Sequence, residues 1–353
     1  MISAGNPESH SREWLFYLVG TLFLLAFTGC GERREIVQLA GQSMGTSWHV
    51  TIVPGPGVPA DDVLQRGIEE ALEQVNRSMS TYRDDSEISR FNATEPGTWF
   101  AVSEDFYAVL SAALAVGWQS NGAYDVTVGP LVDLWGFGPD GSIAAPPPED
   151  AVSNLLEKVG QDQLRLDGEN LRLLKRSELT LDFSSIAKGY AVDRVALWLN
   201  AQGVDNYLVE VGGEMRLSGM SGRGDPWRIA IERPDSSERT ADQAIRVTNV
   251  AVATSGDYRN FFEVDGRRYS HSIDPRTGYP VSHDLVSVTV VDASAMTADA
   301  WATALTVLGF DEGMAVAKAH GLAVYFIKRQ GEGFVSSYTP VFGQFLEKGS
   351  PQD

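Results

Sequence analysis

The order of helix-like and strand-like segments most constrains the fold of this chain. Three segments in its first half, residues 61–79, 103–120 and 149–159, carry apolar side chains at helical spacing. From residue 164 onward, short strand-like segments dominate, and helical patterns return only at 186–201, around residue 299 and at 311–320. A parallel βαβ sheet would instead need strands and helices to alternate strictly. The sequence therefore predicts an α+β fold with mainly antiparallel sheets flanked by helices.

Alternating apolar residues and two turn dipeptides support the strand assignments. Ser47 to Val53 alternates in this way, and an Asp-Gly pair at 167–168 joins the expected strands 164–166 and 171–174. A second Asp-Gly pair, at 265–266, joins two more strands. The other expected strands are 179–183, 207–211, 227–232, 245–252, 261–264, 268–271, 285–291, 323–328 and 334–338.

The N-terminal region has the pattern of an export signal. Trp14 to Thr28 is an apolar run that is too short to span a bilayer comfortably but suits the core of a signal peptide. Small residues then precede Cys30, as in the processing signal of bacterial lipoproteins. We expect a signal peptide at 1–29, a linker at 30–40 that begins with lipidated Cys30, a folded domain at 41–345 and a tail at 346–353. The alternative is an uncleaved signal anchor.

Either reading tethers the chain to a bacterial membrane, facing the periplasm. Cys30 is the only cysteine, which excludes disulfides within the chain and cysteine-based metal sites. The net charge of −19, from 47 acidic and 28 basic residues, comes without a Lys/Arg cluster and argues against a nucleic-acid partner.

Asp299 and Thr303 suggest a cation site. They lie four residues apart in a segment with helical character, so their side chains share one helical face. Both offer hard oxygen donors of the kind that Mg²⁺ takes, but two are too few to hold it without a substrate phosphate. The alternative is structural: Thr297 caps the helix, Asp299 complements the helix dipole, and Thr303 bonds back to a carbonyl.

The segment from Leu181 to Tyr190 suggests an anion site. An expected strand ends here and a helix begins, so free backbone amides and a positive dipole end are available to a phosphate. Lys188, in the first helical turn, adds a suitable point charge. Alternatively, Asp182 and Ser184 cap the helix and Lys188 is solvated. Neither a Walker loop nor a Gly-x-Gly-x-x-Gly motif after a strand is found.

His271 is a candidate general base. It ends an expected strand close to Asp274 and Arg276, and a histidine titrates near neutral pH. A lone histidine is more often structural. No His-Glu-x-x-His or paired-histidine spacing occurs, which argues against a zinc enzyme.

Three loops combine glycine with aromatic or small residues, at 44–48, 122–138 and 211–214. Flat side chains beside exposed backbone suit a planar ring such as adenine or isoalloxazine. Taken singly, each of these loops is better explained by core or turn packing.

Taken together, these segments resemble the FAD:protein FMN transferase family, also called the ApbE or thiamine-biosynthesis-lipoprotein family. The resemblance covers nearly all of the chain beyond the signal region, in the family's order. Its pieces are Met44–Thr46, Ser86–Ser89 with Phe91-Asn92, Tyr124-Asp125 with Gly129–Leu131, Asp182–Asp193, Gly212–Glu214, Ala253–Tyr258, His271–Gly278, and Ala298-Asp299 with Ala302-Thr303.

The resemblance implies an ApbE-like, T-fold-like architecture and a Mg²⁺-dependent enzyme that uses FAD as its substrate. Such an enzyme splits the pyrophosphate of FAD, attaches FMN to a threonine hydroxyl of another protein as a phosphoester, and releases AMP. The acceptor would be an exported protein with an exposed threonine, such as a subunit of a membrane redox complex.

The resemblance also implies roles for particular residues. Asp299 and Thr303 would ligate Mg²⁺ together with the backbone carbonyl of Ser185, where serine replaces the family's glycine or alanine. His271 would be the base on the accepting threonine, with Lys188 as a second catalytic residue. The residues that would hold FAD are Met44, Tyr82, Ala123, Tyr124, Asp125, Asp182, Lys188 and Ile273.

Two other functions fit the same residues. An FAD pyrophosphatase would use this site with water in place of threonine, and the sequence does not separate the two because the acceptor lies on another chain. A non-catalytic FAD-binding lipoprotein is the second alternative, although flavin storage does not require a metal ion. Nothing in these residues implies a role in thiamine synthesis.

Overall fold

The computed structural model of the chain describes residues 35–347, apart from 139–140, 142, 144, 235–239, 257–260 and 265–266. The expected signal peptide, Cys30, the end of the tail and the second Asp-Gly turn lie outside these residues. Among the helices that are described, none is long and apolar enough to cross a membrane.

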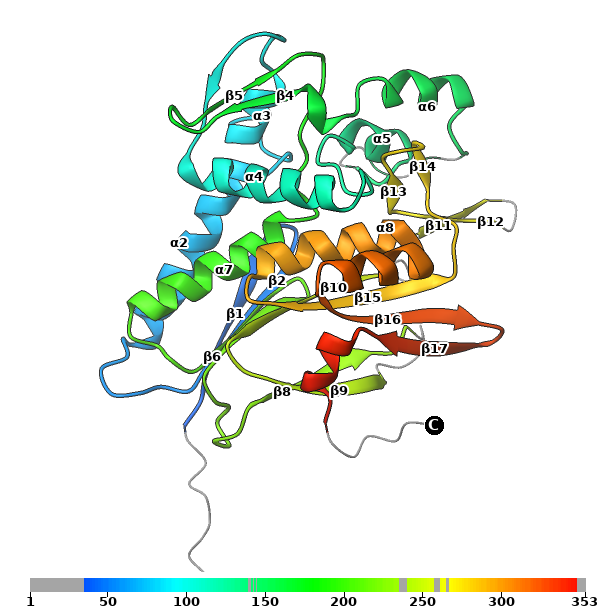
Figure 1. Cartoon of the computed structure of the whole chain (residues 1–353). Helices are drawn as coiled ribbons and strands as arrows, with labels where there is room; N and C mark the ends of the chain where they lie inside the picture. The colour runs from blue at the N-terminus through cyan, green and yellow to red at the C-terminus, as the bar shows by residue number, and fades with distance from the viewer. Residues whose placement is uncertain are drawn as a thin grey trace, which may run out of the picture.

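The centre of the fold is an eight-stranded sheet in which every neighbouring pair is antiparallel (Figure 1). Its order, β1-β2-β6-β7-β10-β15-β16-β17, brings strands from both ends of the described chain into one layer. The strands are β1 (Val37–Ser43), β2 (Thr46–Ile52), β6 (Tyr207–Val211), β7 (Glu214–Ser218), β10 (Val250–Gly256), β15 (Leu285–Asp292), β16 (Ala323–Gln330) and β17 (Gly333–Tyr338).

Three helices pack on one face of this sheet: α2 (Asp61–Met79), α7 (Ala187–Ala201) and α8 (Ala295–Ala319). The apolar stripe of α2 is buried in the main core, as its helical spacing predicts. The opposite face is covered by the hairpin of β8 (Trp227–Glu232) and β9 (Ala241–Val247) and by the 3₁₀ helix η2 (Pro340–Phe345), which share a second core with the sheet. The central strand β15 and most of β16 are therefore buried on both faces of the sheet.

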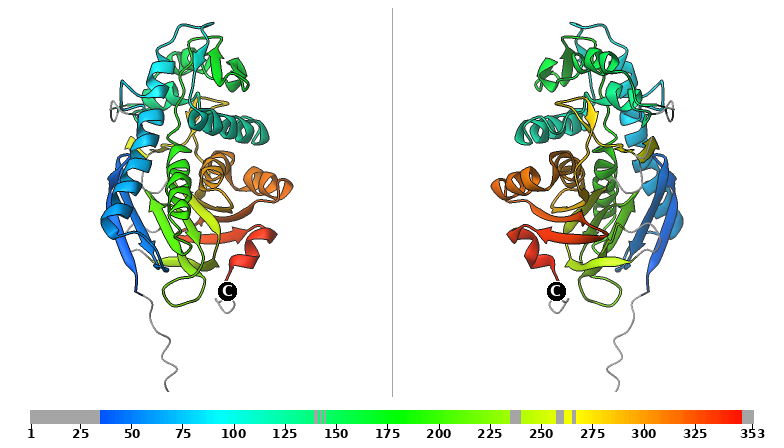
Figure 2. Two further views of the ribbon diagram at one scale, coloured as in Figure 1. Left: turned by 90° about the vertical axis from the view of Figure 1, so that its left-hand side faces the viewer. Right: turned by 90° about the vertical axis from the view of Figure 1, so that its right-hand side faces the viewer.

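A further layer lies beyond these helices, at the top of Figure 1 and in both views of Figure 2. It contains a small sheet of order β3-β5-β4 together with four helices. Its elements are α3 (Glu87–Asn92), β3 (Phe100–Ala101), α4 (Glu104–Gln119), α5 (Gly129–Leu134), α6 (Glu149–Leu156), the 3₁₀ helix η1 (Gln161–Gln163), β4 (Leu164–Asp167) and β5 (Arg172–Lys175). The hairpin of β11 (Phe261–Val264) and β12 (Arg267–Ser270), and that of β13 (Ile273–Asp274) and β14 (Tyr279–Pro280), lie near this layer (Figure 1).

Helix α8 contains the two helices that the sequence predicts around residue 299 and at 311–320. They are separated by a kink at Gly309, whose φ of 74° and ψ of −177° are not helical. A side chain at this position would be strained, and its Cβ would lie 2.8 Å from Cδ2 of His283. Nε2 of His283 lies 2.8 Å from the carbonyl oxygen of Thr306, in the turn of α8 that precedes the kink.

Several boundaries differ from the sequence-based expectation. β1 begins at Val37, so the expected linker 30–40 includes the start of the sheet. The short helices α3 and α5 were not expected. The loop after Asp167 has four residues, 168–171, instead of the two of a tight Asp-Gly turn, and Leu171 adopts a φ of 45°.

The strand expected at 179–183 is wrong. This segment is extended but joins no sheet, because a side chain takes the place of a neighbouring strand. Nδ2 of Asn92 donates to the carbonyl of Leu181 at 2.9 Å, and the amide of Leu181 donates to Oδ1 of Asn92 at 2.7 Å. The amide of Asp182 then donates to the carbonyl of Val126 at 2.8 Å. These bonds fix the backbone that leads into α7.

We expect Asn92→Ala to lower the free energy of unfolding by about 2–4 kcal/mol, because it leaves a backbone donor and acceptor of buried Leu181 without partners. Denaturant unfolding of purified protein would measure the change. Asn92→Asp keeps the acceptor for the Leu181 amide and should lose less. Equal stability of Asn92→Ala and the parent chain would contradict this role.

Candidate active site

The structure contains a cavity of about 920 Å³. It is lined by the first turn of α7, by α8 around residues 299–307, by the β6–β7 turn and by the segment between β12 and β13. Ten of the twelve residues proposed for the site within the described range line it. They are Ala123, Tyr124, Asp125, Asp182, Ser185, Lys188, His271, Ile273, Asp299 and Thr303.

Gly189 allows α7 and α8 to approach closely at the cavity wall. A Cβ at this position would lie 2.3 Å from the carbonyl oxygen of Ala295 and 2.8 Å from Cβ of Asp299. The Gly189 amide donates to Oδ2 of Asp299 at 3.0 Å, and the Asp299 side chain is only 6% exposed. The first turn of α7 is therefore joined to the helix that carries Asp299.

This contact also leaves a carbonyl oxygen available in the turn just before α7. In a regular helix, the Gly189 amide would donate to the carbonyl of Ser185, four residues earlier. Since the amide is directed to Asp299 instead, no backbone N–H among the described residues donates to the Ser185 carbonyl. The Ser185 hydroxyl donates to Oη of Tyr124 at 3.0 Å.

The Thr303 hydroxyl is not used inside α8. Thr306, three residues later, is the threonine that bonds back to a helical carbonyl, that of Ala302, at 2.8 Å. Within the described part of the chain the Thr303 hydroxyl makes no such bond, and Thr303 lines the cavity. The helix begins earlier than expected, since Ser294 is its N-cap and accepts from the amide of Thr297 at 3.2 Å. The structural alternative for Thr297 and Thr303 is therefore wrong.

Lys188 lies between two buried carboxylates. Its Nζ is 3.1 Å from Oε1 of Glu214 and 3.9 Å from Oδ2 of Asp299. Burial alone would lower the pKa of Lys188, but the two acidic neighbours outweigh it and raise that pKa above its ordinary value. Lys188 is therefore not the solvated lysine of the structural alternative.

The two carboxylates respond to the same burial in the opposite sense. Burial raises the pKa of Glu214 to about 8, although the nearby Lys188 opposes the shift, and the charge of Asp299 adds to it. Burial likewise raises the pKa of Asp299 above its usual range, against the effects of Lys188 and the Gly189 amide.

Glu214 is a residue of the cavity wall that the sequence analysis did not assign to the site. It follows the Gly212-Gly213 turn and is 4% exposed. Its Oε2 is a buried oxygen for which the described residues provide no hydrogen-bond partner. The sequence marks the segment 211–214 as a glycine-rich loop and as a piece of the family resemblance, but neither signal gives Glu214 a role.

Asp125 and Asp182 have their carboxylates engaged by the protein itself. Asp125 accepts from the amide and hydroxyl of Thr127 and from the amide of Gln161, and burial raises its pKa. Oδ1 of Asp182 accepts from the amide of Ser184 at 2.7 Å, which forms a local turn before α7 and not a helix cap. Both residues shape the loops of the cavity wall.

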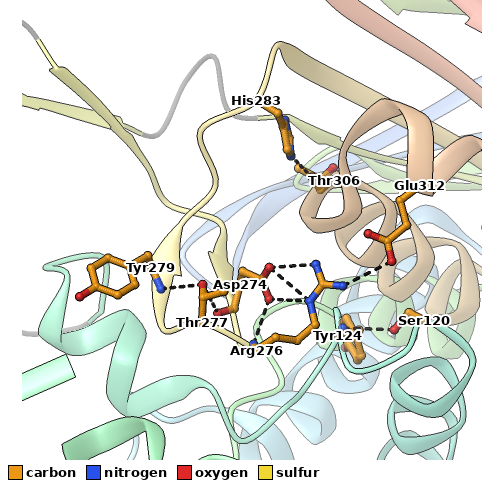
Figure 3. A network of polar contacts seen from close by, with 9 residues as sticks. All are labelled: Ser120, Tyr124, Asp274, Arg276, Thr277, Tyr279, His283, Thr306 and Glu312. Carbon is orange, nitrogen blue, oxygen red and sulfur yellow. Dashed lines mark hydrogen bonds and ion pairs between the residues drawn. The ribbon is translucent and has the colours of Figure 1, made fainter. Parts of the chain in front are cut away.

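His271 lies between β12 and β13, with its ring edge toward Phe137 at a centroid distance of 6.3 Å. The hairpin that follows is tied to α8, as Figure 3 shows. Arg276 pairs with Asp274 at 2.9 Å and reaches Oε1 of Glu312 at 3.4 Å. Asp274 and Arg276, which the sequence places near His271, thus pair with each other.

Met44 and Tyr82 are the two expected FAD contacts that do not line the cavity. Met44 is in the β1–β2 turn with a φ of 54°, and Tyr82 is 75% exposed in the loop after α2. Their expected contacts with FAD stay predictions.

The wall of one cavity combines a buried carboxylate, a lysine and a histidine with a carbonyl and a hydroxyl that receive no bond from the described backbone. Comparison with known proteins then identifies the chain. The family model described as "ApbE family" matches residues 44–326. The chain belongs to the ApbE family.

Named relatives and solved structures agree with this assignment. A Vibrio cholerae protein named FAD:protein FMN transferase is 45% identical over 337 residues, which cover 96% of this chain and all of the relative. An Escherichia coli K12 protein of the same name is 37% identical over 333 residues, covering 91% of this chain and 95% of the relative.

Among solved structures, flavin transferase ApbE from Vibrio cholerae has a TM-score of 0.83 at 45% identity, covering 88% of this chain and 99% of that one. The apo form of Pseudomonas stutzeri flavinyl transferase ApbE also has a TM-score of 0.83, at 42% identity, covering 90% and 98%. The predicted family and the α+β, ApbE-like fold are thus confirmed.

Proposed function

We propose that this chain is an FAD:protein FMN transferase that moves the FMN part of FAD to a threonine of an exported protein, with Mg²⁺, and releases AMP. Membership of the ApbE family makes it an enzyme of the flavinyltransferase class. The observation that best supports the finer proposal is the convergence of the Ser185 carbonyl, Asp299, Thr303 and Lys188 on one cavity wall.

The donor set of the cavity suits Mg²⁺. The described residues contain no cluster of three or more His, Cys, Asp and Glu side chains that could hold a metal ion. A site made of Asp299, the Thr303 hydroxyl and the Ser185 carbonyl does not need one, because Mg²⁺ takes few protein oxygens and completes its shell with water and substrate phosphate. When bound, Mg²⁺ would neutralise charge on the pyrophosphate of FAD.

The other residues have roles that follow from their chemistry. Lys188 provides a positive charge for a phosphate oxygen, and the cavity holds the flavin nucleotide in place. His271 accepts the proton of the threonine hydroxyl as its oxygen attacks the phosphorus of the FMN half. The bond from this phosphorus to the bridging oxygen breaks, and AMP leaves with the electron pair.

The membrane attachment is part of the proposal and is supported by the sequence pattern alone. Cys30 would carry the lipid and hold the enzyme at a bacterial membrane, facing the periplasm. A protein acceptor in a membrane redox complex would then be within reach of the cavity.

The test uses the detergent-solubilised full chain, FAD and Mg²⁺, with and without an exported acceptor domain that bears a candidate threonine. Intact-mass spectrometry of the acceptor and chromatography of AMP and FMN give the readout. We expect a mass gain of one FMN on the acceptor, with AMP released in equal amount and both lost with EDTA. Free FMN and AMP without an adduct would favour the pyrophosphatase, and bound but unaltered FAD would favour a carrier.

A further inference from the structure

Lys188 is hydrogen-bonded to Glu214, whereas its ion pair with Asp299 is longer. The 3.1 Å between Nζ and Oε1 of Glu214 is a hydrogen-bond distance, whereas the 3.9 Å to Oδ2 of Asp299 is too long for a hydrogen bond. Oδ2 of Asp299 instead accepts from the Gly189 amide. Asp299 is therefore a close neighbour of the ammonium group without being its bonded partner.

The turn that carries Glu214 also packs on the stem of Lys188. Gly212 has a φ of 60°, and a Cβ there would lie 3.2 Å from Cδ of Lys188 and 2.8 Å from Cγ2 of Thr46. On the other side, the close contact of Gly189 with α8 fixes the backbone next to Lys188. The lysine thus has little freedom, and the atom that fixes its tip is Oε1 of Glu214.

We propose that Glu214 is a positioning residue that holds Lys188 away from Asp299 and so keeps the Asp299 carboxylate available to a divalent cation. This inference rests on the Mg²⁺ site of the proposed function. An ammonium group bonded to Asp299 would have to be displaced before a cation could bind there, and it would repel that cation. Glu214 prevents this by offering an acceptor oxygen, which a carboxyl group offers with or without a proton.

Substitution of Glu214 by methionine tests the proposal, because methionine keeps the apolar bulk but has no oxygen. The full chain in detergent would be titrated with Mn²⁺ as the probe, without nucleotide, and free Mn²⁺ would be followed by electron paramagnetic resonance. We expect E214M to bind Mn²⁺ at least tenfold more weakly than the parent chain. E214Q keeps an acceptor for Nζ, so its affinity should stay within threefold of the parent.

The double variant E214M/K188M separates positioning from a direct effect on the cation. If Glu214 acts by holding Lys188, then removing Lys188 makes Glu214 unimportant, and the double variant should bind Mn²⁺ within threefold of K188M alone. D299A should abolish Mn²⁺ binding at the Asp299 site. This control therefore shows that the measured Mn²⁺ binds at that site. If E214M does not unfold cooperatively, Glu214→Leu replaces it.

Three results would overturn the proposal. The first is an unchanged affinity in E214M. The second is an equal loss in E214Q and E214M, which would show that the charge of Glu214 matters and not its acceptor. The third is an equal effect of E214M with and without Lys188. No saturable Mn²⁺ binding in the parent chain would remove the metal site itself, and with it this inference; FMN transfer would then be tested separately.

Discussion

Asp299→Asn is expected to lower Mg²⁺-dependent flavin transfer by at least about 10²-fold while leaving the fold intact. A bound metal ion stabilises the charge of the transition state and so lowers the activation free energy of such reactions by several kcal/mol. Each change of about 1.4 kcal/mol corresponds to a tenfold change in rate. In the parent chain the Gly189 amide donates to Oδ2 of Asp299 at 3.0 Å. Asparagine keeps the size of the side chain and an acceptor oxygen for this amide but removes the negative charge.

Comparison with Asp299→Ala separates the two roles of this side chain. Alanine leaves the buried Gly189 amide without its acceptor and should cost about 1–3 kcal/mol of unfolding free energy in addition to activity. Thermal unfolding and initial rates over a range of Mg²⁺ concentrations would measure both effects. Parental activity in Asp299→Asn at low Mg²⁺ would refute the metal assignment.

The local elements of this fold could be predicted because their signals lie within a few residues. Helix α2 spans Asp61–Met79 as its apolar spacing predicts, and the pairing of β11 with β12 follows from two short strand-like runs on either side of an Asp-Gly pair. The order of the eight-stranded sheet could not be predicted. It pairs β2 with β6, and β10 with both β7 and β15, which depends on contacts between segments far apart in the sequence.

The prediction of a strand at 179–183 was wrong for the same reason, because contacts with distant residues decide where this segment's backbone hydrogen bonds go. Its apolar residues are buried as expected, but the backbone of Leu181 bonds to the side chain of Asn92, almost ninety residues earlier, and the amide of Asp182 donates to the carbonyl of Val126. A local pattern reports that a segment is extended and buried. It does not report which group satisfies its backbone donors and acceptors.

The candidate site shows a similar division. Asp299, Thr303 and Lys188 were recognised because each is part of a short motif with chemical meaning. Glu214 was missed because its meaning arises only when Lys188 and Asp299 come from other elements to within 4 Å of one another. The free carbonyl of Ser185 is likewise visible only once the Gly189 amide is seen to bond Asp299.

His271→Ala is expected to slow transfer of FMN by about 10²–10⁴-fold while changing FAD affinity less than about threefold. A correctly placed general base accelerates a reaction by a factor of this order when a neutral hydroxyl must lose its proton. FAD binding needs no proton transfer, and the cavity is lined by many other residues that can contact a nucleotide. The loss should therefore appear in the rate of transfer at saturating FAD.

Flavin fluorescence would give the FAD affinity in EDTA, and single-turnover formation of the acceptor adduct would give the rate. His271→Gln, similar in size and without a base, should be as slow as His271→Ala. Phe137→Leu removes the ring that meets His271 at 6.3 Å and tests whether packing alone explains the loss. If His271→Ala weakens FAD binding as much as it slows transfer, His271 is a binding residue and another group must take the threonine proton.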